Sequence, residues 1–266
     1  MNVASDVEYA ILGIVQGIAE WLPISSKTAV MLFSAYVFGY ALKEAYEIGL
    51  GLQGGTVVAA LAYFLPEYRS FVANKELLKR LAIFLVISTA VTGVVGSLLY
   101  LWIRRALGQS YSVGIPSVVV GVLLLVQALL ARRSRGRRGM GDVGLADSLL
   151  FGFVQGLAAA PGVSRSGVTV TLLLYLGYTL DDSLRLSYLA SILANAGATG
   201  LVLLTGDIGV HGIDLAGMIV ALVSSAAVGY LTISYMLKLA SKHSRKLTLS
   251  MGLIAIAVGL AAVMAH

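Results

Sequence analysis

The sequence predicts an all-α polytopic membrane bundle, an inverted repeat of two halves with six transmembrane helices and two re-entrant helical hairpins. Hydrophobic residues make up 58% of the 266 residues and charged residues only 12%. A soluble domain is about half apolar and about a quarter charged, so this chain has too few charges to coat a water-facing surface. Long apolar segments recur along the chain, and a related polar motif occurs once in each half. These three observations carry the prediction.

Six apolar segments are long enough to cross a membrane as helices, which takes roughly 20 residues each. They lie at 47–65, 81–103, 113–131, 184–205, 215–237 and 247–265. Four shorter segments form two pairs, at 7–22 with 28–42 and at 145–160 with 167–178. A proline followed by hydroxyl and basic residues interrupts each pair, at 23–27 and at 161–165. We therefore predict two re-entrant hairpins.

The two hairpins are related in sequence. Residues 13–19 match residues 152–158 at an offset of 139, and Pro23, Ser26 and Lys27 match Pro161, Ser164 and Arg165 at an offset of 138. Because polar residues align too, chance similarity between Gly- and Ala-rich helices is the weaker explanation. Each half then has one hairpin and three spans, and an odd number of spans inverts the second half in the membrane. The predicted organisation is a first repeat over 1–131, a basic cytoplasmic linker over 132–144 and a second repeat over 145–266.

Basic residues predict the orientation, because cytoplasmic loops carry an excess of Lys and Arg. The densest cluster lies in the linker and is formed by Arg132, Arg133, Arg135, Arg137 and Arg138. The segment 206–214, on the opposite side, has Asp207 and Asp214 and neither Lys nor Arg. We expect a multi-pass protein of the cell membrane with both termini on the extracytoplasmic side. Arg104 and Arg105 are exceptions to this charge pattern.

Other classes of protein are disfavoured. With no cysteine in the chain, disulfides, thiolate metal sites and a cysteine nucleophile are excluded. The N-terminus lacks a basic start before an apolar run, so no cleavable signal peptide is expected. The arginine cluster could bind lipid or RNA, but a topology signal accounts for it. Without a basic tract interleaved with aromatic residues, no nucleic-acid partner is predicted.

Polar residues at the two breaks predict an anion site inside the membrane. Gln16 and Glu20 share one helix face because they are four residues apart, and an ionisable group at membrane depth costs on the order of 2.5–3.5 kcal/mol. In the second break, Arg165 offers a planar fork for phosphate oxygens. A helix that begins near Ser164 would also point free backbone N–H groups and its positive dipole end into the break.

Plainer explanations exist for both residues. In the plainer explanation for Glu20, this residue lies near a membrane interface or pairs with a cation in a structural role. In that for Arg165, the guanidinium neutralises Glu20 beside a helix start that is capped by a hydroxyl. If the two breaks face each other, however, Lys27 and Arg165 lie opposite Glu20. A carboxylate beside a phosphate is then best explained by a bridging divalent cation or by general-base catalysis.

The chain resembles the undecaprenyl pyrophosphate phosphatase family, the bacitracin-resistance membrane phosphatases. The family motif (E/Q)-x-x-x-E is matched by Gln16 and Glu20, and P-G-x-S-R-S-x-x-T is matched at every fixed position over 161–169. Residues 22–26 and Gln53 also fit, and the resemblance covers nearly the whole chain. It implies hydrolysis of a polyprenyl diphosphate to the monophosphate and inorganic phosphate within the bilayer. It also implies a divalent cation, magnesium or calcium, and a role in recycling a lipid carrier.

The resemblance also implies site residues. Ser26 corresponds to the nucleophile, Glu20 to an essential carboxylate that also holds the metal, and Arg165 to the phosphate-binding group. The remaining residues expected to bind substrate are Gln16, Ser25, Lys27, Gln53, Gly162, Ser164, Ser166 and Thr169.

One position departs from the family pattern. Members commonly carry a histidine where Ala29 stands, and a serine without an adjacent base is a weak nucleophile. Either Glu20 serves as the base, a metal-bound water attacks directly, Lys27 takes part, or the protein binds without cleaving. The alternative function is therefore a non-catalytic polyprenyl-phosphate transporter or flippase. The oligomeric state is open, with a homodimer as one option.

Overall fold

The computed structural model describes residues 6–22, 24–66, 68–69, 74–107, 114–130, 136–205 and 215–264. Within these ranges every regular element is a helix, and the β pairing is limited to an isolated bridge between Arg138 and Tyr178. The predicted all-α class is therefore confirmed. The elements are α1 (Asp6–Ala19), α2 (Ser26–Val37), α3 (Leu42–Gly51), α4 (Gln53–Tyr63), α6 (Lys75–Leu107), α7 (Gly114–Leu130), η1 (Met140–Asp142), α8 (Leu145–Leu157), α9 (Arg165–Tyr175), α10 (Leu180–Thr205) and α11 (Leu215–Met264). Outside the described residues lie Pro23, Arg132, Arg133, Arg135, Asp207 and Asp214.

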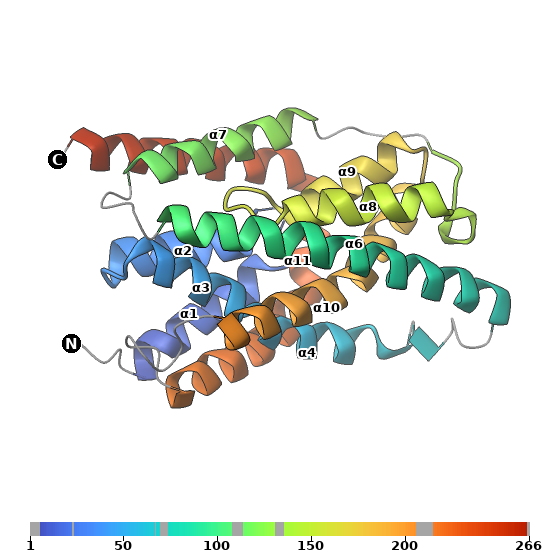
Figure 1. The fold of residues 1–266 in the computed structure, drawn as a ribbon, viewed down its shortest axis with the longest axis horizontal. Coiled ribbons are helices and arrows are strands. Elements are labelled where there is room, and N and C mark those ends of the chain that lie inside the picture. The colour runs from blue at the N-terminus through green and yellow to red at the C-terminus, as the bar shows by residue number, and fades with distance from the viewer. Residues whose placement is uncertain are drawn as a thin grey trace.

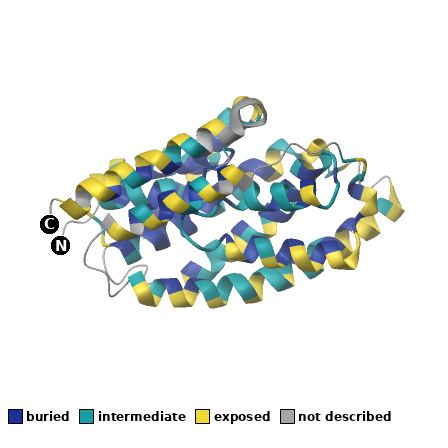
Figure 2. Cartoon of the chain, turned by 90° about the horizontal axis from the view of Figure 1, so that it is seen from above, coloured by how far each residue is buried: buried dark blue, intermediate teal, exposed yellow. Residues whose placement is uncertain are grey.

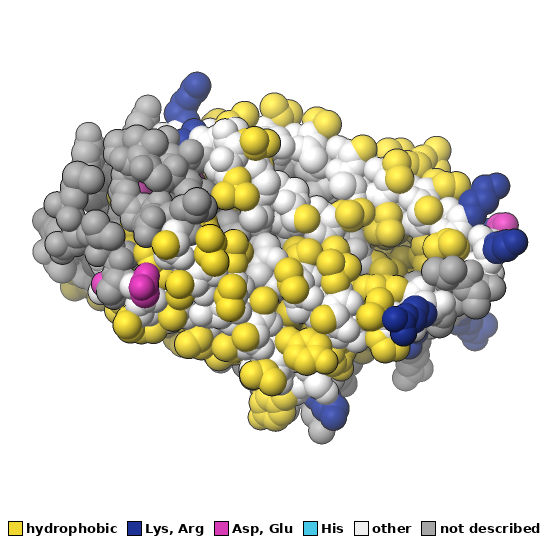
Figure 3. Space-filling view, turned by 90° about the horizontal axis from the view of Figure 1, so that it is seen from below, with side chains coloured by type: hydrophobic (Ala, Val, Ile, Leu, Met, Phe, Trp, Pro, Cys, Tyr) yellow, Lys and Arg dark blue, Asp and Glu magenta, His cyan; other side chains and the backbone are white. Residues whose placement is uncertain are grey.

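The helices form an elongated bundle (Figure 1), and many of its large apolar side chains are exposed. In the described part, three helices are long and apolar enough to cross, at Lys75–Leu107, Leu180–Thr205 and Ala216–Lys238. Exposed residues lie along the outer helices (Figure 2). Hydrophobic side chains cover much of the face in Figure 3, while Lys and Arg gather mainly toward one end. Trp102 is 68% exposed and Leu204 86% exposed, as expected for side chains that face lipid instead of water.

The chain segment 47–65 differs from the single unbroken span that the sequence predicts. Helix α3 ends at Gly51 and α4 begins at Gln53, with Leu52 between them. Four glycines within 49–55 weaken the helix. Thr199 of α10 donates a hydrogen bond to the Gly51 carbonyl at 3.0 Å, so a neighbouring helix satisfies a carbonyl at the break. A break of this kind has an identifiable cause, namely a side chain that inserts into the helical ladder.

The segments 215–237 and 247–265 also differ from expectation, because no loop separates them. Both belong to α11, which is helical from Leu215 to Met264. Its first and last residues lie at the end of the molecule where the two termini lie, so the element doubles back (Figure 1). Helix α6 begins at the opposite end (Figure 1). The two arms of α11 thus take the place of the two predicted spans.

Glycines let each hairpin pack closely on a long helix from the other half of the chain. A Cβ at Gly13 of α1 would lie 2.3 Å from the Ala221 carbonyl oxygen of α11. A Cβ at the repeat-matched Gly152 of α8 would lie 2.6 Å from the Ser88 carbonyl oxygen of α6. Small residues permit this backbone approach in membrane bundles. The two halves therefore interlock, and neither hairpin rests on its own half alone.

Two ion pairs fix helix ends. Arg104 of α6 donates to Glu47 of α3, whose side chain is 1% exposed, so this exception to the charge pattern neutralises a buried carboxylate. In the linker, Arg138 pairs with Asp147 at 2.6 Å and lies over the Tyr178 ring, 4.3 Å from its centroid. This second pair ties the linker to the start of α8.

Candidate active site

The tips of the two hairpins touch. Lys27, in the first turn of α2, donates from Nζ to the Val163 carbonyl oxygen at 2.7 Å. In the opposite direction, the Gly162 backbone N–H donates to Thr28 Oγ1 at 2.8 Å. The start of α2 therefore contacts the turn that precedes α9, although more than a hundred residues separate them in sequence.

Local sequence explains the shape of the second tip. Gly162 has φ +84, a left-handed conformation that favours glycine, and a Cβ there would lie 2.8 Å from Val120 Cα. Ser164 is the N-cap of α9, and its Oγ accepts a hydrogen bond from the Gly167 N–H at 3.3 Å. The prediction that a helix begins near Ser164 is confirmed. Arg165 follows directly as the first residue of α9.

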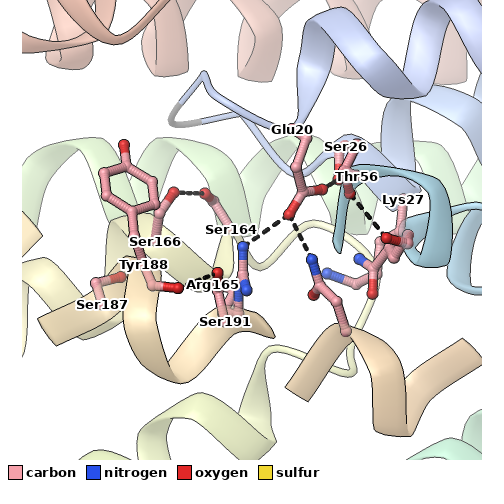
Figure 4. Close-up of polar contacts among 12 residues, drawn as sticks. Glu20, Ser26, Lys27, Thr56, Ser164, Arg165, Ser166, Ser187, Tyr188 and Ser191 are labelled. Carbon is pink, nitrogen blue, oxygen red and sulfur yellow. Dashed lines mark hydrogen bonds and ion pairs between the residues drawn. The ribbon is translucent and has the colours of Figure 1, made fainter. Parts of the chain in front are cut away.

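Glu20 lies at the centre of a polar cluster (Figure 4). Its Oε1 accepts hydrogen bonds from Arg165 Nη2 at 2.7 Å and from Asn195 Nδ2 at 2.8 Å. Its Oε2 accepts from Ser26 Oγ at 2.6 Å and from Gln16 Nε2 at 2.9 Å. Glu20 is 6% exposed, so one cationic side chain and three neutral donors take the place of water around its carboxylate. The expected meeting of Glu20 and Arg165 is present.

Lys27 takes a different place from the one expected opposite Glu20. Its Nζ donates to Ser25 Oγ at 3.0 Å and to the Val163 carbonyl. Lys27 is 3% exposed. Because Ser25 and Val163 belong to different hairpins, Lys27 holds the two tips together.

A pocket of about 440 Å³ opens beside this cluster. Its size is within the range of small-molecule sites. Its walls include residues of both hairpins, of α4, of α6 and of α10. The polar residues at the hairpin end are Glu20, Ser25, Ser26, Lys27, Gln53, Ser164, Arg165, Ser166 and Asn195. Eight of the residues that the sequence singles out are thus brought together around one space.

Three predicted residues lie behind the wall instead of on it. Gln16 is fully buried and orients Glu20 and Ser26, the latter at 3.5 Å. Thr169 Oγ1 donates to the Arg165 carbonyl oxygen at 2.8 Å and contacts Ser187 Oγ at 2.7 Å. The third, Gly162, shapes the turn. None of the three is among the residues that line the pocket.

Asn195 is the site residue that no motif indicates. It comes from α10, is 4% exposed and donates to the same carboxylate oxygen as Arg165. An amide within the apolar segment 184–205 is a signal of the same kind as Glu20, because polar groups at membrane depth are retained when they have a partner. A search for isolated polar residues in the long spans would have found it.

Two buried polar atoms of the cluster have no hydrogen-bond partner: Arg165 Nη1 and Gln16 Oε1. Nη1 is a donor available to an anion. Gln16 Oε1, next to Glu20, is an acceptor of the type that hard cations prefer. Among the described residues no group of three or more His, Asp or Glu could hold a metal by itself. The donor set therefore fits a magnesium-like ion only if substrate oxygens complete its coordination.

The fold and the cluster together define an integral membrane protein with a buried polar site between two helical hairpins. The chain belongs to the family described as Bacitracin resistance protein BacA, which it matches over residues 9–261.

Relatives agree with this assignment. A protein named Undecaprenyl-diphosphatase from Sulfurisphaera tokodaii is 39% identical over 243 residues, which is 90% of each chain. One of the same name from Pyrobaculum aerophilum is 38% identical over 259 residues, covering 94% of this chain and 96% of the relative. The family that the motifs indicate is confirmed.

Proposed function

We propose that this protein is a membrane-embedded phosphatase that hydrolyses a polyprenyl diphosphate of the undecaprenyl type. The products are the polyprenyl monophosphate and inorganic phosphate, and the reaction recycles a lipid carrier. Family membership and the name shared by its relatives support this activity. The observation that carries it is the 2.6 Å hydrogen bond from Ser26 Oγ to Glu20 Oε2, in a pocket that Arg165 also lines.

Ser26 is proposed as the nucleophile and Glu20 as its base. Ser26 Oγ bonds to the terminal phosphorus while its proton passes to Glu20. The bond from that phosphorus to the bridging oxygen breaks, and the monophosphate leaves with the bridging oxygen and takes the proton from Glu20. Water then attacks the phosphoserine, gives a proton to Glu20, and releases phosphate as Ser26 Oγ is reprotonated by Glu20. Glu20 thus supplies the base function that Ala29 cannot.

Arg165 and the hydroxyls are proposed to hold the reacting phosphate. The unpartnered Nη1 of Arg165 and the hydroxyls of Ser164 and Ser166 are donors on the pocket wall. The N-terminus of α9 adds a positive dipole end at this wall. These groups stabilise the charge that builds on the phosphoryl oxygens in the transition state.

A divalent cation, magnesium or calcium, is proposed to be held by the Glu20 carboxylate on the pocket wall, which Gln16 orients from behind. When bound, such an ion neutralises phosphate charge and acts as a Lewis acid. The guanidinium of Arg165 supplies further positive charge at the site.

The finer architecture is also proposed: six spans, two re-entrant hairpins, repeats over 1–131 and 145–266, and both termini outside the cell. The positions of the two ends and of the start of α6 support this topology (Figure 1). Because the chain has no cysteine, single cysteines introduced at Asn2 and at Gly141 would report their sides. A membrane-impermeant maleimide should label the first and not the second in intact cells. The reverse result would contradict the orientation.

The activity is tested by phosphate release from C15 and C55 prenyl diphosphates in detergent, with and without EDTA. We expect release that EDTA abolishes and added Mg²⁺ restores. Ser26→Ala should release no phosphate. When the wild-type reaction is quenched with acid, the peptide that contains Ser26 should carry a trapped phosphate. Absence of release by the wild type would contradict the function. Full release by Ser26→Ala would contradict only the nucleophile.

A further inference from the structure

Among the described residues, three glycines within α-helices are unexplained by helix packing. Most helical glycines here let backbones approach, as at Gly49, where a Cβ would lie 2.4 Å from the Lys27 carbonyl oxygen. At Gly93, Gly197 and Gly200, by contrast, a Cβ would meet nothing within 4 Å. Glycine within a helix costs roughly 0.5–1 kcal/mol relative to alanine. No contact within the described protein offsets this cost at these three positions.

All three glycines line the same pocket as the polar cluster. Gly93 belongs to α6, and Gly197 and Gly200 belong to α10. On α10 the pocket runs from Asn195, which binds Glu20, to Leu204, a distance of about 14 Å along the helix axis. Leu204 is 86% exposed. The space therefore continues from the carboxylate cluster, between α6 and α10, to a side chain on the lipid-facing surface.

Polar side chains of α6 and α8 also line this pocket. Gln155 of α8 is 3% exposed. Its Nε2 donates to Thr92 Oγ1 at 3.1 Å, whereas its Oε1 has no hydrogen-bond partner. Thr89 Oγ1, on the adjacent turn of α6, is also buried without a partner. Both side chains line the pocket. An unpartnered buried polar atom is costly unless a ligand or water completes it, so this wall is built to face a polar group.

We infer that the groove between α6 and α10 holds the isoprenoid chain next to the diphosphate. Gly93, Gly197 and Gly200 set the width of this groove. The inference rests on the proposed function and adds where the lipid tail lies. The diphosphate occupies the end at Glu20 and Arg165, and Thr89 and Gln155 face its prenyl-bearing phosphate, directly or through water. The first isoprene units then lie where the three glycines present no side chain. The groove therefore has room for the methyl branches of the isoprene units.

Gly93→Leu and Gly197→Leu test the groove, since each places a branched side chain in it. We expect KM for a C15 prenyl diphosphate to rise roughly tenfold with kcat at saturation little changed, because the reacting groups are untouched. Gly141→Leu is the matched control, since its Cβ also meets nothing within 4 Å but it lies in η1, away from the pocket. Its KM should equal that of the wild type. Unchanged KM in both groove variants would overturn the inference.

Photolabelling of the wild-type protein locates the tail without relying on turnover. A prenyl monophosphate that carries a diazirine on its first isoprene unit is irradiated with the wild-type protein in detergent. We expect the label in peptides from α6 and α10, with loss of label in Gly197→Leu. Label confined to other helices would contradict the proposed position of the isoprenoid chain, even if hydrolysis occurs. Label in α6 and α10 without any hydrolysis would support the proposed position of the isoprenoid chain and contradict the proposed phosphatase activity.

Discussion

Arg165 and Glu20 form an ion pair across 145 residues of sequence, with 2.7 Å between Nη2 and Oε1. The two side chains come from the two hairpins, and their side chains are 13% and 3% exposed. A pair this deep gains little net stability when intact, because desolvation offsets attraction, but loss of one partner leaves an uncompensated charge. The pair therefore holds the pocket in a charged, preorganised form until an anion competes for Arg165.

Glu20→Gln should abolish most activity. The amide keeps the shape of the side chain but removes the base for Ser26, so kcat should fall by roughly 10²–10⁴. Phosphate release at saturating substrate measures this change. Glu76→Gln is the control, because Glu76 forms an exposed i,i+4 pair with Arg80. Activity near the wild-type level in Glu20→Gln would exclude Glu20 as the base.

Arg165→Lys should raise KM. Lysine keeps the positive charge but not the planar fork that binds two phosphate oxygens at once. A hydrogen bond to a charged group contributes about 1.5–3 kcal/mol, so KM should increase at least roughly tenfold. Arg185→Lys, in an exposed pair with Asp181, should leave KM unchanged. Equal KM values in the wild type and Arg165→Lys would show that the fork does not bind substrate.

Asn195→Ala should lower kcat and leave KM nearly unchanged. Asn195 contacts Glu20 and acts through its position, so loss of the amide affects the base more than substrate binding. One lost hydrogen bond to a carboxylate predicts roughly a tenfold decrease in kcat. The kcat and KM values are measured together with the unfolding temperature in detergent. A lower unfolding temperature with unaltered kcat would assign Asn195 a purely structural role.

Gly49→Ala should impair both stability and activity. Its Cβ would lie 2.4 Å from the Lys27 carbonyl oxygen, so α2 must shift at the turn that carries Ser26. Overpacking of this kind costs about 1–3 kcal/mol. Thermal unfolding and phosphate release report the two effects, and Gly141→Ala, with open space around its Cβ, should show neither. A fully stable and active Gly49→Ala would mean that α2 can shift without moving Ser26.

Arg104→Leu should destabilise the fold more than the double change Arg104→Leu with Glu47→Leu. The single variant removes the cation next to a carboxylate that is 1% exposed. Breaking a buried pair costs about 3–5 kcal/mol, whereas replacing both partners by apolar residues is often nearly neutral. The unfolding temperatures of the single and the double variant measure this difference in stability. If the double variant is the less stable of the two, the pair contributes net stability.

Much of the site is predictable because its local signals are strong. A proline and hydroxyl residues between two short apolar segments mark each hairpin, and the helix start at Ser164 is confirmed by its N-cap. The opposed carboxylate and guanidinium follow from the poor solvation of charge at membrane depth. Asn195 is missed because it lies alone in a long span, where no neighbouring residue reveals which helix face meets the pocket.

Hydropathy and local motifs are enough to predict the membrane class, the two helical hairpins and the residue types that meet between them. These properties depend on hydropathy and on contacts between near neighbours along the chain. The tertiary structure alone decided the break at Leu52, the reversal within α11, the contact of Asn195 with Glu20 and the open groove between α6 and α10. Each of these depends on which helices pack together, and that is fixed by backbone approach between distant segments, such as Gly13 on Ala221, which hydropathy does not encode.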